Sequence, residues 1–463
     1  PQHPVKTFAE VQEYLYSLLP VYNRDGKQAV TRTLDKTQQL LTALGEPQQT
    51  FRSIHVGGTN GKGSVSSMLA ALLREAGIPS VGLYTSPHLI YFGERMRVNG
   101  TPMPEAAVLD WVNAHRELIE WLRPSFFELT VAMAFHWFAQ RQVEWAVVEV
   151  GLGGRLDSTN VITPELAVIT QVGMDHMEFL GETYPEIAYE KAGIIKPGVP
   201  VVIGPHEALP LTLPVFEAKA QQENASLWDA RQVQVYRVPQ LKKEGPDSAR
   251  FKTWEVTIRE AWADSPTPGV TVTLDLPGEY QQANLATVVT AWRALQESEE
   301  NWPSFEEVSP ALSTTQKTTG LRGRMEMVSQ EPCPIWMDVA HNPEALKGVF
   351  HNLGKQAQDF DRLWVVFACA ADKPLTQMLE QMPKDAHYVL TQFPGIRARK
   401  VEDTAQVFQN WLGVETPNLH LEANPQQAFA WVRQQASPED MILITGSVFL
   451  VAELIPNFPL NPA

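Results

Sequence analysis

The chain has 463 residues, enough for two or three domains that each bury a hydrophobic core. Its formal charge of −16 excludes general binding to nucleic acid or to acidic membranes, because both need a basic face. With two cysteines, Cys333 and Cys369, it is no disulfide scaffold, and both are predicted to be small core residues. We find no signal-like N-terminus and no apolar run of about 18 residues, and therefore expect a cytoplasmic protein without membrane segments.

The first part of the chain predicts two helices and then a strand that leads into a helix. Apolar periodicity indicates amphipathic helices over residues 7–20 and 30–44, joined by the polar turn 22–26. An apolar strand over 51–56 runs into the glycine-rich turn 57–64. The helix that follows carries one apolar stripe, made of Val65, Met68, Leu69, Leu72 and Leu73.

The turn between this strand and helix has the composition of a phosphate-binding loop. Backbone N–H groups and the positive end of the helix dipole face an anion at such a bend. Lys62 adds a full charge, and the Ser64 hydroxyl can reach a phosphate or its magnesium ion. The spacing departs from the standard P-loop, because Val56 replaces the first glycine and Gly63 separates Lys62 from Ser64. The alternative is an ordinary glycine-rich turn between a strand and a helix.

The rest of the first half predicts a parallel sheet with helices between its strands. Buried strands are expected over 80–84, 145–150, 166–172 and 199–203, and helices over 104–122, over 125–141 and from Thr183 onward. Short antiparallel strands are expected at the edge of the sheet within 226–276, before helices over 281–296 and 305–319.

The second half repeats this pattern after a domain break near residue 319. Strands are expected over 335–339, 363–368, 387–391 and 441–445, with helices near 343–353, 374–381, 402–412 and 426–435. The pattern predicts a smaller Rossmann-like α/β domain that lacks a GxGxxG fingerprint. The predicted domains are therefore 1–319 and 320–463.

Polar residues follow several strands of the first domain, where open α/β sheets bind ligands. Ser86, Glu149, Asp175 and His176 offer a hydroxyl, carboxylates and an imidazole, which suit one or two magnesium ions bound to nucleotide phosphates. The alternatives are that Glu149 only hydrogen-bonds a loop and that His176 only caps the next turn. Lys191 falls in the last turn of a helix, where spacing alone predicts a solvated side chain.

The second domain offers a similar group after its first strand. Asp338 can accept a ribose hydroxyl, and His341 opens a helix. Arg322 and Arg324 lie near the domain join, from which an arginine can reach a γ-phosphate when domains close. The alternative for these arginines is a surface ion pair.

Seven motifs occur in an order that resembles the folylpolyglutamate synthase/dihydrofolate synthase family of the Mur ligase superfamily. They are GTNGKGS (58–64), TSPHL (85–89), EVGLGGRLDSTN (149–160), DH (175–176), EKAGIIKPG (190–198), GR (323–324) and DVAHNP (338–343). The resemblance implies a central P-loop Mur-ligase domain with a mainly parallel sheet, followed by a smaller Rossmann-like domain. Residues 1–319 would bind ATP, and 320–463 would form the glutamate ligase domain.

The activity implied by this resemblance is ATP-dependent amide ligation. In the family, a pterin-linked carboxylate attacks the γ-phosphate, and the amine of L-glutamate then attacks the acyl phosphate. The implied substrates are ATP, L-glutamate and dihydropteroate or a reduced folate, acted on by a monomer. The alternatives are a Mur-type ligase acting on a nucleotide-sugar peptide and a non-enzymatic P-loop switch that binds ATP.

The resemblance also implies a role for individual residues. Lys62, Lys191 and His341 would be catalytic, with Lys191 carried as a carbamate that can bind a second metal ion. Ser86, Glu149 and His176 would bind magnesium. The ATP contacts would be Gly58, Thr59, Asn60, Gly61, Lys62, Gly63, Ser64, Asn284, Arg324 and Asp338. The turn 23–26 and the loop after Ser86 would contact the pterin. Two positions depart from the family pattern, Val339 where glycine is usual and Ala283 where histidine is frequent.

Overall fold

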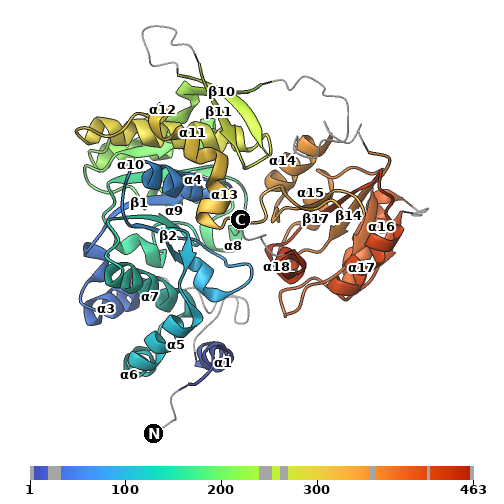
Figure 1. Ribbon diagram of the computed structural model, residues 1–463, viewed down its shortest axis with the longest axis horizontal. Coiled ribbons are helices and arrows are strands. Elements are labelled where there is room, and N and C mark those ends of the chain that lie inside the picture. Colours follow the sequence, from blue (N-terminus) through green and yellow to red (C-terminus); the bar gives the residue numbers. More distant parts are fainter. Residues whose placement is uncertain are drawn as a thin grey trace. The chain divides into compact units, whose positions relative to one another are not determined.

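The computed structural model describes residues 5–18, 33–238, 253–260, 269–354, 360–413 and 418–458, and the predicted turn 22–26 lies outside them. The chain forms two compact units. Unit 1 comprises Pro1–Val238, Glu255–Leu274 and Gln282–Leu321, and unit 2 comprises Pro239–Trp254, Asp275–Gln281 and Arg322–Ala463. Both units combine helices with a mainly parallel sheet, which confirms the predicted α/β class (Figure 1).

The main sheet of unit 1 has the strand order β4-β3-β2-β5-β1-β6-β7-β8. Pairing is parallel from β2 to β8, and β3 and β4 add an antiparallel edge. Its strands are β1 (Arg52–Gly57), β2 (Val81–Tyr84), β3 (Met96–Val98), β4 (Thr101–Pro102), β5 (Trp145–Glu149), β6 (Leu166–Ile169), β7 (Val201–Ile203) and β8 (Leu227–Asp229). The central strands are buried on both faces, as their continuous apolar sequences predict.

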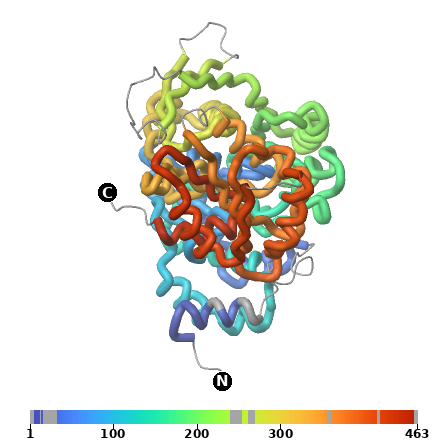
Figure 2. The backbone as a smooth tube through the Cα atoms, turned by 90° about the vertical axis from the view of Figure 1, so that its right-hand side faces the viewer, coloured from blue at the N-terminus to red at the C-terminus, as the bar shows by residue number. Residues whose placement is uncertain are grey.

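The helices of unit 1 largely follow the predicted ranges. Helix α1 lies beside α5, where the Val5 amide donates a 3.1 Å hydrogen bond to the Asn113 side chain (Figure 2). These helices are α1 (Phe8–Leu18), α3 (Asp35–Ala43), α4 (Lys62–Glu75), α5 (Glu105–Ala114), α6 (Arg116–Leu122), α7 (Phe126–Gln140), α8 (Met177–Leu180), α9 (Tyr184–Ala192), α10 (Leu209–Gln222), α11 (Gln281–Ser298), α12 (Phe305–Val308) and α13 (Thr315–Thr319). Short 3₁₀ turns occur at Pro47–Gln49, Phe92–Arg95, Ser158–Val161, Ala230–Gln232 and Ser309–Thr314.

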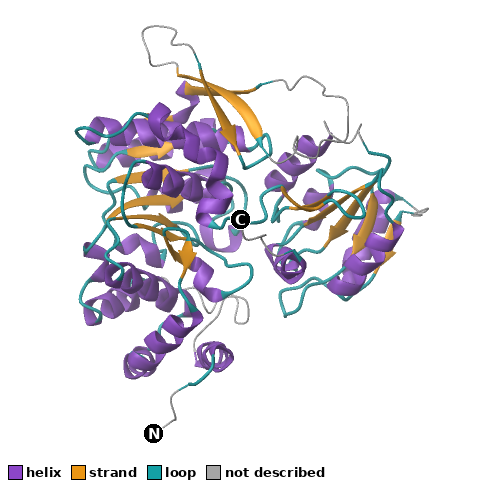
Figure 3. Ribbon diagram, in the orientation of Figure 1, coloured by secondary structure: helices purple, strands orange, loops and turns teal. Residues whose placement is uncertain are grey.

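Four details of unit 1 differ from the prediction. The helix expected over 104–122 breaks at His115, and the one expected over 305–319 divides into α12, a 3₁₀ segment and α13. The expected antiparallel strands do not extend the main sheet: β9 (Val233–Arg237), β10 (Trp254–Glu260) and β11 (Val270–Leu274) form a separate three-stranded sheet (Figure 3). Helix α10, which contains Pro214, is not among the predicted helices.

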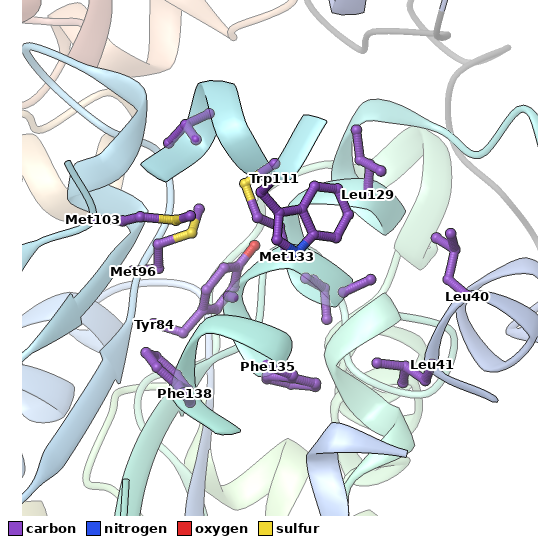
Figure 4. Packing of buried hydrophobic residues seen from close by; sticks show 14 of the residues in the cluster. Leu40, Leu41, Tyr84, Met96, Met103, Trp111, Leu129, Met133, Phe135 and Phe138 are labelled. Atoms are coloured by element: carbon purple, nitrogen blue, oxygen red, sulfur yellow. The ribbon is translucent and has the colours of Figure 1, made fainter. Parts of the chain in front are cut away.

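One face of the main sheet packs against aromatic side chains of α7. Phe135 and Phe138 of this helix meet Tyr84 of β2 in a large apolar cluster that also holds Trp111 (Figure 4). Farther along the same face, Ala167 and Ile169 of β6 belong to a second cluster with α9 and α10. Val148 of β5 belongs to the first of these clusters. Because side chains alternate between the faces of a strand, the next residue, Glu149, points to the opposite face of the sheet.

Unit 2 is built on a six-stranded sheet with the order β12-β13-β17-β14-β15-β16. All neighbouring pairs are parallel except β12 with β13. The strands are β12 (Glu326–Ser329), β13 (Ile335–Met337), β14 (Leu363–Phe367), β15 (His387–Leu390), β16 (Leu419–Leu421) and β17 (Met441–Thr445). The helices are α14 (Pro343–Gly354), α15 (Leu375–Leu379), α16 (Val401–Leu412), α17 (Pro425–Gln435) and α18 (Val448–Leu454), followed by a 3₁₀ turn at Ile455–Asn457. Cys333 and Cys369 are both buried, as predicted.

Candidate active site

The glycine-rich turn after β1 can form only because it lacks side chains at two positions. Gly58 has a φ of +142°, and a Cβ atom there would lie 1.9 Å from the Thr170 hydroxyl. Gly61 has a φ of +88°, and its Cβ would lie 2.2 Å from the Asn284 side-chain oxygen. Both the backbone conformation and the close approach therefore require glycine. The shape of the turn therefore depends on Thr170 and Asn284, its neighbours in unit 1.

Residues after β6 hold this turn in place. The Thr170 hydroxyl donates a 2.7 Å hydrogen bond to the Asn60 carbonyl. The Thr59 amide donates to the Gln171 carbonyl at 2.6 Å, and the Thr59 hydroxyl accepts from the Gly173 amide at 3.0 Å. Thr170 was not predicted, since a threonine at the end of a buried strand carries no motif.

Helix α4 begins at Lys62, directly after the turn. The first N–H groups of a helix have no partner within it, so its N-terminus favours an anion. The Lys62 ammonium donates to the Thr59 carbonyl at 3.1 Å and is thus held over the turn. Ser64 is buried in the first turn of the same helix. The geometry fits a phosphate cradle with one cation.

Asn284 comes from α11, more than 200 residues later in the chain. Its side chain is buried and lies against Gly61, so the structure brings this predicted nucleotide contact to the phosphate loop. The sequence alone gave no spatial reason for this placement.

Ser86 and Glu149 meet at the carboxyl ends of two adjacent strands, β2 and β5. The Ser86 amide donates a 3.3 Å hydrogen bond to Glu149 Oε2, and Glu149 is buried. A hydroxyl and a carboxylate fit Mg²⁺, which usually keeps several waters and takes its other ligands from phosphates. Among the residues that the structure describes, no three His, Cys, Asp or Glu side chains cluster as metal ligands.

His176 lies on the loop after β6 and has a left-handed φ of 50°. Its amide donates to Asp175 Oδ1 at 2.8 Å, and its Nε2 lies 3.9 Å from Asp175 Oδ2. The His176 side chain forms no capping hydrogen bond with α8, which removes that alternative interpretation.

Lys191 is buried, with 2 % of its surface exposed, so the prediction of a solvated side chain is wrong. The pKa of its ammonium is lowered from 10.5 to about 7, chiefly by burial and in smaller part by the positive charge of Lys62. The carboxylates of Asp175 and Asp157 act in the opposite direction. Three charged side chains from different segments of unit 1 therefore act electrostatically on Lys191. Asp157 was overlooked as a site residue even though it lies within the motif 149–160.

In unit 2, Asp338 is a buried carboxylate with several donors. Its Oδ2 accepts from the Tyr280 hydroxyl at 2.9 Å and from the Met325 amide at 2.8 Å, while Oδ1 accepts from the Ala340 amide at 2.8 Å. Burial raises the pKa of Asp338, and the nearby Arg324 guanidinium opposes this. The structure thus brings Arg324 and Asp338 together. It adds Tyr280, which sequence reasoning missed.

His341 follows Asp338 on the same loop. Its Nδ1 donates a 2.9 Å hydrogen bond to the Val339 carbonyl, which fixes the ring and makes Nδ1 a protonated nitrogen. Val339 replaces the expected glycine without disrupting this loop, because its amide still donates to the Gly323 carbonyl at 3.1 Å.

Arg322, near the domain join, is buried rather than exposed. Its guanidinium donates to Glu326 Oε1 at 2.5 Å and to the Phe458 carbonyl at 3.0 Å. Arg322 is therefore part of a buried ion pair within unit 2, and the surface alternative is wrong for this residue.

Comparison with known proteins identifies both halves of the chain. Residues 56–292 match the Mur ligase middle domain, and residues 323–448 match the Mur ligase glutamate ligase domain. The dihydrofolate synthase/folylpolyglutamate synthase of Bacillus subtilis is 32 % identical over 91 % of this chain and 94 % of its own length.

Solved structures of related proteins match the fold of this chain over nearly its whole length. Mycobacterium tuberculosis folylpolyglutamate synthase complexed with ADP has a TM-score of 0.83 at 27 % identity, covering 98 % of this chain and 99 % of that one. A complex of FPGS with AMPPCP and folate has a TM-score of 0.77 at 31 % identity, over 98 % and 99 % of the two chains. None of the helices that the structure describes is long and apolar enough to cross a membrane.

Proposed function

We propose that this chain, which belongs to the folylpolyglutamate synthase/dihydrofolate synthase family of Mur ligases, joins L-glutamate to dihydropteroate or a reduced folate. The reaction converts ATP to ADP and phosphate. Support comes from relatives named for these activities and from family structures that contain ADP, or AMPPCP with folate. The domain with the phosphate loop, 1–319, binds ATP, and 320–463 serves as the glutamate ligase domain.

The observation that carries the proposal is the arrangement of charge around the phosphate loop. The Lys62 ammonium donates to the Thr59 carbonyl and so lies over the turn that leads into the N-terminus of α4. A cation beside a helix N-terminus favours a phosphate ligand in an otherwise acidic protein.

The reaction proceeds in two displacements. An oxygen of the pterin-linked carboxylate attacks the γ-phosphorus of ATP, and ADP leaves, which gives an acyl phosphate. The amine of glutamate then attacks the acyl carbon, loses a proton and expels phosphate, which forms the amide. Catalysis of the first step consists mainly of positioning and of stabilising charge on the phosphoryl oxygens, a role that suits Lys62.

We assign the other site residues by the same reasoning. Gly58–Ser64 and Asn284 of unit 1 and Arg324 and Asp338 of unit 2 are assigned to ATP binding, and His341 is assigned to catalysis. Ser86 and Glu149, with His176, hold Mg²⁺, which neutralises phosphate charge when bound. Lys191 carries a carbamate that binds a second metal ion. Its burial and lowered pKa support this assignment, because the neutral amine is the form that reacts with CO₂.

An acceptor comparison tests the proposal. Purified protein is given ATP, Mg²⁺ and L-glutamate with either 7,8-dihydropteroate, tetrahydrofolate or a nucleotide-sugar muropeptide, and ADP release is followed. We expect glutamate-dependent ADP release with at least one pterin acceptor and none with the muropeptide. Turnover with the muropeptide alone, or ATP binding without turnover with any acceptor, would contradict the proposal.

A further inference from the structure

The loop 151–160, between β5 and the 3₁₀ turn at Ser158–Val161, packs against the end of α9 that carries Lys191. The Arg155 amide donates to the Glu190 carbonyl at 2.8 Å, and the Asn160 side chain donates to the Gly193 carbonyl at 3.0 Å. A Cβ atom on Gly154 would lie 2.8 Å from the Glu190 carbonyl oxygen. The contact is therefore tight, and a shift of loop 151–160 would disturb the backbone on both sides of Lys191.

The Asp157 carboxylate accepts hydrogen bonds from both parts of this loop. Its Oδ2 accepts from the Leu152 amide at 2.8 Å, and its Oδ1 accepts from the Thr159 amide at 3.0 Å and from the Thr159 hydroxyl at 2.5 Å. The carboxylate thus holds both halves of the loop together. It is also one of the two negative charges that act on Lys191.

The chain of hydrogen bonds continues to His55, in the strand that leads to the phosphate loop. His55 Nε2 lies 2.9 Å from the Thr159 hydroxyl oxygen, and both residues are completely buried. Burial lowers the pKa of His55 to about 3, so its imidazole is neutral. The single hydroxyl proton of Thr159 is donated to Asp157, so the hydroxyl oxygen accepts from His55. His55 therefore carries its proton on Nε2.

His55 has apolar surroundings, in which burial of a polar side chain costs free energy. The strand register places it on the same sheet face as Val148 and Ala167, two core residues of unit 1. A polar group buried among apolar side chains loses free energy unless it is hydrogen-bonded, and an aliphatic residue would avoid that loss.

We propose that His55 is a positioning residue for the ligase reaction, which acts through Thr159 and Asp157 to hold loop 151–160 and thereby fix Lys191. This inference rests on the proposed function, because it gives His55 a part in that reaction. His55 itself touches no substrate in this account.

The first test compares two variants of Thr159. Thr159→Val removes the hydroxyl at constant shape, whereas Thr159→Ser keeps it. We expect kcat of Thr159→Val to fall about 10- to 100-fold, the range found when partners of metal ligands are removed, with little change in KM for ATP. Thr159→Ser should remain close to wild type. Hydrogen exchange should become faster in peptides spanning 151–160 and 184–195 of Thr159→Val only.

A second pair of variants, at position 55, tests the imidazole directly. It also keeps the proposal testable if Thr159→Val does not fold. The side-chain amide of His55→Gln reaches the position of Nε2, whereas that of His55→Asn, one methylene shorter, does not. We expect His55→Gln to retain more kcat and a better protected loop than His55→Asn. Equal kcat and equal exchange within both pairs would overturn the proposal. If wild type itself turned over no acceptor, the proposed function would fail, and the exchange comparison would still decide whether His55 holds the loop.

Discussion

The hydroxyl of Thr170 donates a 2.7 Å hydrogen bond to the carbonyl of Asn60 and so joins the end of β6 to the phosphate loop. The same hydroxyl occupies the space that a side chain on Gly58 would need. The shape of the loop is therefore determined by a residue more than 100 positions away in the sequence.

We expect Thr170→Val to raise KM for ATP about five- to tenfold, because the partly buried Asn60 carbonyl loses a hydrogen bond worth about 1 kcal/mol. Thr170→Ser keeps the hydroxyl and serves as the control. Steady-state kinetics with varied ATP measures the effect, and equal KM values for the two variants would show that this bond does not shape the ATP site.

Replacing Lys62 with methionine should lower kcat about 100-fold or more, as found when one group that stabilises developing charge is removed. The fold should persist, because the Lys62 ammonium has one protein contact, with the Thr59 carbonyl, among the bonds described. The control is Lys219→Met on α10, whose ion pair with Glu223 lies outside the proposed site. Equal kcat for the two variants would contradict the role of Lys62.

Lys191→Ala should abolish most of the turnover, and added acetate or high carbonate should restore part of it by replacing the missing carboxylate. Mass spectrometry of wild-type protein prepared under CO₂ supplies a separate readout, with a mass increase that matches one carbamate. Unchanged activity of Lys191→Ala without additives would show that the carbamate assignment is wrong.

The hydroxyl of Tyr280 is expected to matter for ATP binding through Asp338. Tyr280→Phe removes one of the donors to Asp338 Oδ2 and should raise KM for ATP about fivefold, equivalent to about 1 kcal/mol. Tyr388→Phe is the control, since Tyr388 is a buried tyrosine elsewhere in unit 2 whose hydroxyl donates to the Pro383 carbonyl. An equal rise of KM in both variants would show that the effect comes from a less stable unit 2, and it would contradict a role of Tyr280 in ATP binding.

The pKa of His55 predicts a pH dependence of stability. In the unfolded chain His55 takes up a proton near pH 6.5, whereas the folded protein excludes that proton until about pH 3. The unfolded state binds more protons in this window, so this contribution to stability is lost as pH falls, by up to about 1.4 kcal/mol per pH unit. The stability advantage of wild type over His55→Gln in urea unfolding should therefore shrink from pH 7 to pH 4. A constant difference would contradict the neutral, buried imidazole.

Much of the fold follows from local sequence patterns. The central strands were predicted because they are continuous apolar runs, and helix α9 because Thr183 and Glu186 form the expected capping box. The separate sheet β9–β11 could not be predicted, since short alternating strands do not reveal which sheet they join. The break at His115 likewise depends on tertiary packing, because the sequence there is helical in character.

The glycine-rich turn between β1 and α4 was predicted from the sequence, while its support by Thr170 was not. Glycines and a lysine at a helix start form a local motif, which one segment of sequence reveals. The burial of Lys191, the support from Thr170 and the chain from His55 to Asp157 depend on contacts between distant segments. A polar residue inside an apolar strand, such as His55, was the available signal for such a contact.

The formation of an acyl phosphate is tested most directly by isotope transfer. An acceptor labelled with ¹⁸O in the reacting carboxylate is incubated with ATP, Mg²⁺ and L-glutamate, and the released phosphate is examined by mass spectrometry. We predict that each phosphate carries one ¹⁸O atom from the carboxylate, because that oxygen remains bonded to phosphorus when the glutamate amine displaces it. Amide product accompanied by unlabelled phosphate would contradict the account.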